Sequence, residues 1–242
     1  MPALPSEFGA ELGNEIELDS LWPAEATARM NRMYRRQRHV YDFTRRYYLL
    51  GRDQLIENLR PQAGCHVLEI GCGTGRNLVQ AAKRFPAAKF FGIDVSTEML
   101  TSAIASIARQ GFGSRIRVAH GDATAFDPKA LFGTPAFDHV MISYSLSMIP
   151  AWNQVIASAL SHVKPGGRLH IVDFGALEKL PGIARNLLLR WLELFDVTPR
   201  DDLERVLADV ARARGADLTF ERPFRGYAQY AVLTLPAGSA RP

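Results

Sequence analysis

Cysteine is scarce in this chain, where only Cys65 and Cys72 occur among 242 residues. The two flank one predicted strand and have no cluster of histidines beside them. This arrangement excludes a disulfide framework and a zinc site of the usual spacing. We therefore expect two reduced thiols, one buried and one in a turn, and no bound metal.

Long apolar runs are also lacking. No stretch reaches the roughly 18 apolar residues that a membrane-spanning helix requires. Residues 1–13 lack the basic start and the apolar centre of a signal peptide. The expected location is therefore the cytoplasm, with any membrane contacted only from its surface. With 47% hydrophobic and 22% charged residues, the composition excludes disorder and predicts one globular domain.

Lysine and arginine are absent from residues 1–28, which carry six acids. Residues 29–52 reverse the sign, with eight arginines and five aromatic side chains against the single acid Asp42. Such a segment favours an anionic partner. We predict a flexible acidic tail over 1–28 and a basic helical cap over 29–63 that faces a membrane. A solvated basic helix over the cofactor site is an alternative that the pattern leaves open.

From residue 64 onward, short β-rich apolar runs alternate with longer helical ones, which predicts an α/β fold with a mostly parallel sheet. Strands are expected over 66–70, 89–93, 116–119, 137–143, 167–174, 218–220 and 227–235, and helices over 77–85, 97–110, 152–163, 181–195 and 200–214. The last two strands are separated by too few residues for a helical crossover, so they should pair antiparallel. This plan of seven strands resembles the Rossmann-like class I methyltransferases, which implies such a domain over residues 64–236.

A glycine-rich turn follows the first strand. Glu69 is succeeded by Gly71, Gly73 and Gly75, directly before a helix. Glycines permit a close approach of a ligand to the backbone, and the N-terminus of the helix attracts anionic groups. A dinucleotide site would need a third glycine where Arg76 stands. The spacing instead resembles the nucleotide turn of S-adenosylmethionine enzymes, which implies that cofactor, its product S-adenosylhomocysteine, and Glu69 as the acceptor for the cofactor's ammonium group.

Further cofactor contacts follow from that resemblance. Asp94, at the end of the second strand, is expected to accept from the ribose hydroxyls. Asp122, after the third strand, is expected to accept from the adenine amino group, with an N-cap role as the alternative. The full set of cofactor-binding residues that we expect is Tyr41, Glu69, Gly71, Cys72, Gly73, Gly75, Asp94, Val95, Met99, Asp122, Ala123 and Ser143.

Three blocks narrow the resemblance. Residues 34–53 (YRRQRHVYDFTRRYYLLGRD), 143–152 (SYSLSMIPAW) and 225–233 (RGYAQYAVL) resemble the bacterial betaine-lipid N-methyltransferases. That family methylates diacylglyceryl homoserine three times. The resemblance therefore also implies a separate enzyme at the membrane that transfers the 3-amino-3-carboxypropyl group to diacylglycerol. More distantly, Tyr41 and Asp42, together with residues 197–200, resemble the ubiquinone and menaquinone methyltransferases. Arg45 stands where those enzymes commonly have Asn, which favours the lipid.

The expected reaction needs a neutral amine aligned with the methyl group, and burial beside a sulfonium lowers the pKa of the amine, so no strong base is required. Tyr144 and Ser147 are the candidates for orienting the amine and accepting its proton. An arginine should bind the headgroup carboxylate, and aromatic faces should attract the methylated ammonium. The substrate-binding residues that we expect are Arg45, Arg46, Tyr47, Arg52, Tyr144, Met148, Arg225 and Tyr227.

Two other functions stay open. A quinone or small-molecule methyltransferase would use the same fold. An RNA methyltransferase or a nucleic-acid-binding module would use arginine interleaved with aromatics, although the acidic residues 1–28 disfavour nucleic acid. A second apolar stretch, over 187–195, is expected either to border an acyl groove or to belong to the core.

Overall fold

The computed structural model describes residues 49–179, 181–193 and 197–238. The predicted tail over 1–28 and most of the predicted cap lie outside these residues. The same holds for four predicted site residues, Tyr41, Arg45, Arg46 and Tyr47.

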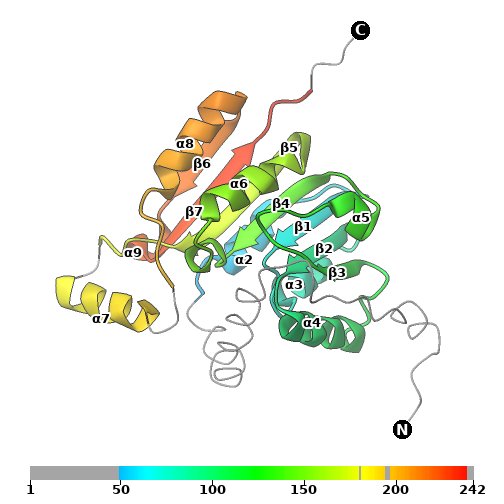
Figure 1. Cartoon of the computed structure of the whole chain (residues 1–242), viewed down its shortest axis with the longest axis horizontal. Coiled ribbons are helices and arrows are strands. Elements are labelled where there is room, and N and C mark those ends of the chain that lie inside the picture. The colour runs from blue at the N-terminus through cyan, green and yellow to red at the C-terminus, as the bar shows by residue number, and fades with distance from the viewer. Residues whose placement is uncertain (1–48, 180, 194–196, 239–242) are drawn as a thin grey trace. The chain divides into compact units, whose positions relative to one another are not determined.

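A seven-stranded sheet forms the centre of the described domain, with the strand order β3-β2-β1-β4-β5-β7-β6 (Figure 1). The strands are β1 (His66–Ile70), β2 (Lys89–Asp94), β3 (Ile116–His120), β4 (Phe137–Ser143), β5 (Val163–Phe174), β6 (Asp217–Glu221) and β7 (Ala228–Thr234). Strands β1 to β5 run parallel, and β7 is antiparallel to both β5 and β6. The predicted fold class and the antiparallel end of the sheet are therefore confirmed.

Helices cover both faces of the sheet because side chains alternate along each strand. On one face, Val67 and Met141 pack in one core cluster with residues of α2 (Arg52–Leu59), α3 (Arg76–Arg84) and α4 (Thr97–Arg109). On the other face, Leu68 and Val140 pack in a second cluster with residues of α5 (Pro128–Phe132), α6 (Trp152–Ser161) and α8 (Leu203–Arg214). The remaining elements are η1 (Leu146–Met148), α7 (Gly182–Glu193) and α9 (Pro223–Gly226).

Capping residues explain most helix bounds. The Ser96 hydroxyl accepts a hydrogen bond from the Met99 amide at 3.3 Å, so α4 begins where a serine N-cap predicts. Gly215 ends α8 in the left-handed conformation, with φ 61°. The expected start of α8 at residue 200 was wrong, because α8 begins at Leu203 with Asp202 as its N-cap. Arg200 instead points its side chain toward the turn after β4, as described below.

The helix α2 belongs to the core of the domain. Its residues Leu55, Ile56 and Leu59 are buried and pack in the same cluster as Val67 of β1. The last part of the predicted cap over 29–63 is therefore packed on the sheet. Both cysteines are free thiols; Cys72 is buried in the glycine turn and Cys65 is half-buried before β1. Among the described residues, no helix has the length and apolarity needed to cross a membrane.

Candidate functional site

The three glycines after β1 have positive φ values, 72° for Gly71, 52° for Gly73 and 71° for Gly75. A side chain at Gly71 would lie 2.8 Å from the Ser145 side chain, so the turn packs directly on the loop after β4. At Gly73, in contrast, no described atom lies within 4 Å of the position that a Cβ would take. Gly73 is therefore the point at which a ligand can approach the backbone most closely.

Glu69 is almost completely buried beside this turn, with 1% of its surface exposed. Its Oε1 accepts a hydrogen bond from Asn77 Nδ2 at 2.7 Å, whereas Oε2 has no hydrogen-bond partner within the structure described. Burial raises the pKa of Glu69 to about 8, although the Asn77 hydrogen bond and the charge of Arg52 act in the opposite direction. A buried carboxyl oxygen without a partner is a site for a cationic group, because an ammonium would stabilise the ionised form.

Sequence reasoning missed Asn77. It lies in the first turn of α3, eight residues after Glu69, and the sequence offers no sign that this side chain turns back toward β1.

Asp94 connects the glycine turn to the end of β2. Its Oδ2 accepts from the Gly73 amide at 2.7 Å, and its Oδ1 accepts from the Ser96 amide at 2.9 Å. The interaction of Asp94 with the ribose hydroxyls stays a prediction. The Cys72 amide donates to the Ile93 carbonyl at 2.9 Å, and burial raises the pKa of the Cys72 thiol well above its usual value. Cys72 thus holds the turn to β2 through its backbone amide, and its thiol is neutral.

The segment after β3 lies next to these groups. Asp122 Oδ1 accepts from both the amide and the hydroxyl of Thr124 at 2.7 Å, which is a local turn. The alternative of Asp122 as an N-cap was wrong, because Asp127 caps the next helix, α5. His120 Nε2 lies 3.1 Å from the Val95 carbonyl oxygen and joins this segment to the end of β2. Contacts of Val95, Met99, Asp122 and Ala123 with adenine stay predictions.

Tyr144, directly after β4, is buried and has a φ of 55°. Its hydroxyl donates a hydrogen bond to the Leu50 carbonyl. Its ring lies 4.6 Å from the Phe174 ring between centroids, and the Phe174 ring lies 5.9 Å from that of Tyr227, both in edge contacts. Burial raises the pKa of Tyr144 well above its usual range. In this structure Tyr144 is a neutral donor that holds Leu50, and the proton-accepting role stays a prediction.

The turn η1 carries Ser147 and Met148 and is held by hydrogen bonds from several sides. Asp173 Oδ2 accepts from the Ser147 amide at 3.2 Å. Arg200 donates to the carbonyls of Leu146 at 3.0 Å and Ile149 at 2.9 Å. These contacts fix the backbone of η1 at the carboxyl end of β4.

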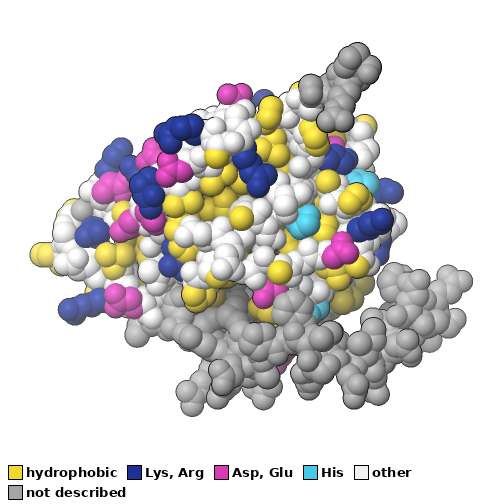
Figure 2. Space-filling model, turned by 45° about the horizontal axis from the view of Figure 1, so that its top comes forward, with side chains coloured by type: hydrophobic (Ala, Val, Ile, Leu, Met, Phe, Trp, Pro, Cys, Tyr) yellow, Lys and Arg dark blue, Asp and Glu magenta, His cyan; other side chains and the backbone are white. Residues whose placement is uncertain are grey.

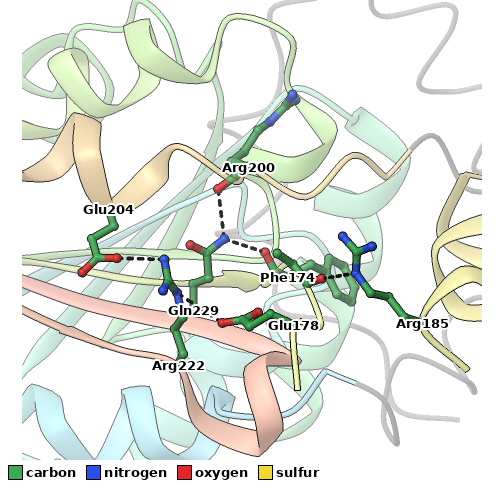
Figure 3. A network of polar contacts seen from close by, with 8 residues as sticks. Phe174, Glu178, Arg185, Arg200, Glu204, Arg222 and Gln229 are labelled. Carbon is green, nitrogen blue, oxygen red and sulfur yellow. Dashed lines mark hydrogen bonds and ion pairs between the residues drawn. The ribbon is translucent and has the colours of Figure 1, made fainter. Parts of the chain in front are cut away.

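Gln229 of β7 completes this network, as Figure 3 shows. Its Nε2 donates to the carbonyls of Phe174 and Arg200, both at 3.0 Å. Burial raises the pKa of Asp173, while the hydrogen bonds from Ser147 act in the opposite direction. Arg200, Gln229 and Phe174 are further residues that sequence reasoning missed as parts of the site, because only the packed sheet brings them to η1.

The two described arginines of the predicted substrate-binding set differ in burial and in contacts. Arg52 is 8% exposed, donates to the Leu49 carbonyl at 3.3 Å, and its charge lowers the pKa values of Glu69 and Tyr144. It therefore lies within electrostatic reach of both groups. Arg225 is exposed in α9 and makes no hydrogen bond or ion pair with another described residue. Arg52 thus lies at the site, and contact of Arg225 with the substrate stays a prediction.

The family model described as a methyltransferase domain matches residues 67–167, the segment that runs from β1 through the first residues of β5. These residues form a methyltransferase domain. The match covers the glycine turn, Asp94, Asp122 and the turn after β4. The matched segment therefore contains every predicted cofactor-binding residue except Tyr41.

Curated relatives of the methyltransferase domain act on different acceptors. The chain is 27% identical over 55% of its length to a ubiquinone/menaquinone biosynthesis C-methyltransferase of Dinoroseobacter shibae, of which it covers 52%. It is 32% identical over 48% of its length to the nocamycin O-methyltransferase of Saccharothrix syringae, of which it covers 40%. The chain thus spans about half the length of the curated relatives that it matches.

Solved structures share the fold at low identity. An O-methyltransferase family protein from Burkholderia thailandensis has a TM-score of 0.65 at 20% identity, over 86% of this chain and 63% of that protein. The phosphoethanolamine N-methyltransferase 2 of Haemonchus contortus, in complex with S-adenosyl-L-methionine, has a TM-score of 0.60 at 18% identity, over 76% of this chain and 52% of that protein. The described residues therefore have the class I methyltransferase fold. The methyltransferase domain matched over residues 67–167, together with the curated relatives, indicates an S-adenosylmethionine-dependent methyltransferase.

Proposed function

We propose that this protein transfers methyl groups from S-adenosylmethionine to the amine of diacylglyceryl homoserine, in three steps that give diacylglyceryl trimethylhomoserine. The observation that carries the choice of acceptor is the meeting of three distant segments at Tyr144. These are the three blocks, 34–53, 143–152 and 225–233, that resemble the betaine-lipid N-methyltransferases.

Contacts around Tyr144 join the described parts of these blocks. Its hydroxyl donates to Leu50 of the first block. Its ring packs on Phe174, which in turn packs on Tyr227 of the third block. Because the blocks lie about 90 residues apart in the sequence, their contact at the carboxyl end of β4 and β5 supports a shared role in binding the acceptor.

The residues of the glycine turn fit the cofactor. Glu69 offers a buried oxygen without a partner to an ammonium group, Gly73 leaves space at the backbone, and Asp94 presents a carboxylate at the end of β2. When bound, S-adenosylmethionine supplies an electrophilic methyl group. The chain's own contribution is to hold the reacting groups in line and to exclude water, which is worth several kcal/mol in such reactions, about 7 or more where alignment is good.

The acceptor side of the site needs a cation for a carboxylate and an apolar, aromatic wall for an amine that gains methyl groups. Arg52 supplies a buried positive charge. Tyr144, Phe174 and Tyr227 supply aromatic faces, which attract a quaternary ammonium by about 0.5–2 kcal/mol. The hydroxyl of Ser143 is buried with no described partner and is a candidate to orient the amine. Phe174 is a new member of the predicted aromatic set.

The location and the partner follow from this acceptor. A diacyl lipid stays in a bilayer, so we propose that the protein works at the inner membrane surface from the cytoplasmic side. A separate enzyme must make the headgroup by adding a 3-amino-3-carboxypropyl group to diacylglycerol, and we propose that this enzyme supplies the substrate.

The direct test is to incubate the purified protein with labelled S-adenosylmethionine and diacylglyceryl homoserine in mixed micelles, and to resolve the lipid products by mass. We expect products with one, two and three added methyl groups. The Glu69→Gln variant serves as the control for cofactor dependence. No lipid product, with S-adenosylhomocysteine still bound by the protein, would refute this acceptor.

A quinone is the second candidate acceptor, favoured by the curated relatives that are named as quinone methyltransferases. The same assay with a demethylated menaquinone in place of the lipid distinguishes the two. Methylation of the quinone alone would assign the protein to that reaction.

A further inference from the structure

The helix α7 carries apolar side chains on two opposite faces. Leu192 is buried in the core with 1% of its surface exposed. Ile183 and Leu187, one helical turn apart, are 88% and 71% exposed. Because nine residues correspond to two and a half turns, Ile183 and Leu192 lie on opposite sides of the helix. A helix exposed to water normally has one apolar face only, so the outer face of α7 indicates a second apolar environment.

The turn α9 presents a third apolar side chain. Phe224 is 46% exposed. Phe224 and Arg225 both have left-handed backbone conformations, with φ values of 55° and 59°, which are unfavourable for residues other than glycine. Strain of this kind persists where the surrounding structure holds it, and it tends to mark functional sites. Here it keeps an aromatic and a basic side chain at the surface.

Contacts with residues 176–178 hold α7 and α9 on the same edge of the domain. The Leu177 amide donates to the Gly226 carbonyl at 3.0 Å. Arg222 Nε lies 3.5 Å from Glu178 Oε1 in an ion pair. The Arg185 side chain, from α7, donates a hydrogen bond to the Ala176 carbonyl at 2.8 Å. Figure 3 shows Arg222, Glu178 and Arg185 around this segment, and Figure 1 shows α7 and α9 at the same edge.

Basic side chains accompany the three apolar ones. Lys179, Arg190 and Arg225 are exposed, and none of them makes an ion pair with another described residue. Glu178 is paired with Arg222, which leaves Glu193 as the exposed acid of α7. Figure 2 shows hydrophobic side chains among both basic and acidic ones at the left edge, where α7 lies in Figure 1.

We propose that Ile183, Leu187 and Phe224, with Lys179, Arg190 and Arg225, form a surface that docks on an anionic lipid bilayer. We call it the α7–α9 surface. Separate apolar side chains among cations suit the interface of a membrane, where the apolar groups enter the acyl boundary and the cations contact anionic headgroups. A second copy of the chain is less suitable, because a symmetric contact would bring like charges together. This docking deepens the proposed function and rests on it, because a diacyl acceptor is reached at a bilayer.

The test is flotation of the full-length protein with vesicles of phosphatidylcholine, alone or with about one-third phosphatidylglycerol. We expect binding to the anionic vesicles that weakens with salt. The variant Ile183→Ser/Leu187→Ser should lose affinity about tenfold or more, since two apolar side chains no longer enter the bilayer. Lys179→Gln/Arg190→Gln should lose about tenfold for anionic vesicles and little for neutral ones. Ile104→Ser is the matched control, because Ile104 is 49% exposed on α4, away from this surface.

Insertion is measured by a polarity-sensitive fluorophore at residue 187 or 104, introduced as Leu187→Cys or Ile104→Cys in a Cys65→Ser background. We expect a blue shift on anionic vesicles for position 187 only. Equal vesicle binding by Ile183→Ser/Leu187→Ser and Ile104→Ser, or no shift at position 187, would refute the proposal even where residues 1–48 bind lipid. Self-association that depends on Ile183 and Leu187, without vesicle binding, would assign the surface to a second copy. None of these measurements requires turnover, so failure of docking is distinct from failure in the micelle assay.

Discussion

At the scale of single residues, we expect Glu69 to make the binding of the cofactor depend on pH. In the free protein, burial raises the pKa of Glu69 to about 8, with Asn77, Arg52, Asp94 and Arg76 as the other groups that act on it. A bound ammonium favours the ionised form, so binding near pH 7 should release a proton. We expect the affinity for S-adenosylhomocysteine to rise between about pH 6 and 7, below the range in which the ligand's own amine titrates.

Calorimetry in buffers of different ionisation enthalpy measures that proton. Glu69→Gln should abolish the release and weaken binding about tenfold or more, as expected for the loss of a charged hydrogen bond. Asp122→Asn is the control, because Asp122 is predicted to contact the adenine and its replacement should leave the proton release intact. Proton release by the Glu69→Gln protein would contradict the assignment.

Two roles are open for Tyr144: it either positions the substrate or accepts the proton of the substrate amine. The hydroxyl donates to Leu50, and burial keeps the pKa of Tyr144 above its usual range. We therefore expect Tyr144→Phe to lower kcat by about tenfold, the effect of one lost hydrogen bond of about 1–1.5 kcal/mol, without changing the pH profile. Loss of the limb on which the rate rises with increasing pH would instead support proton acceptance, because a base acts only when it is deprotonated.

At the scale of elements, the glycine turn after β1 contains one glycine with no room for a side chain and one beside which a ligand has space. A methyl group at Gly71 meets the Ser145 side chain at 2.8 Å, whereas Gly73 has open space. We expect Gly71→Ala to lower the free energy of unfolding by about 2–3 kcal/mol through the clash and the positive φ. Gly73→Ala should cost only about 1 kcal/mol, yet it should strongly weaken S-adenosylhomocysteine binding.

Urea unfolding and calorimetry check both variants. Gly64→Ala is the matched control, because Gly64 has a φ of 81° and open space but precedes β1, away from the turn. It should show the same strain as Gly73→Ala with unchanged affinity. Equal affinities of the two variants would show that no ligand approaches Gly73.

Elements with strong local signals were predictable from the sequence, and contacts that depend on packing were not. The strands, the cap at Ser96 and the end at Gly215 follow from alternation and capping residues. The short helix α5 was missed, because five residues carry no periodicity. Glu69 was found through its motif, but Asn77 and Arg200 were not, since the sheet alone decides that they face Glu69 and η1.

At the scale of the whole domain, a buried pair of histidines makes stability depend on pH. His139 of β4 and His170 of β5 lie with Nδ1 and Nε2 3.3 Å apart, at the centre of the sheet that supports both cores. Burial lowers the pKa of His139 to about 4 and that of His170 to about 3, from 6.5. Both rings are therefore neutral in the folded protein. As the pH falls below 6.5, the unfolded chain takes up protons that the folded one does not, so this contribution to stability is lost.

Glu69 acts in the opposite direction, because its raised pKa stabilises the fold as the pH falls from about 8. The wild-type slope alone is therefore not diagnostic. The informative comparison is with His139→Asn/His170→Gln, which keeps polar atoms near Nδ1 and Nε2 but does not titrate. Between pH 6.5 and about 5, the wild type should lose about 3 kcal/mol more free energy of unfolding than this variant. The reason is that both imidazoles bind a proton in the unfolded chain and stay neutral in the folded protein. Urea denaturation at each pH gives both slopes, and parallel slopes would show that the pair does not govern acid stability, since only the two imidazoles differ between the proteins.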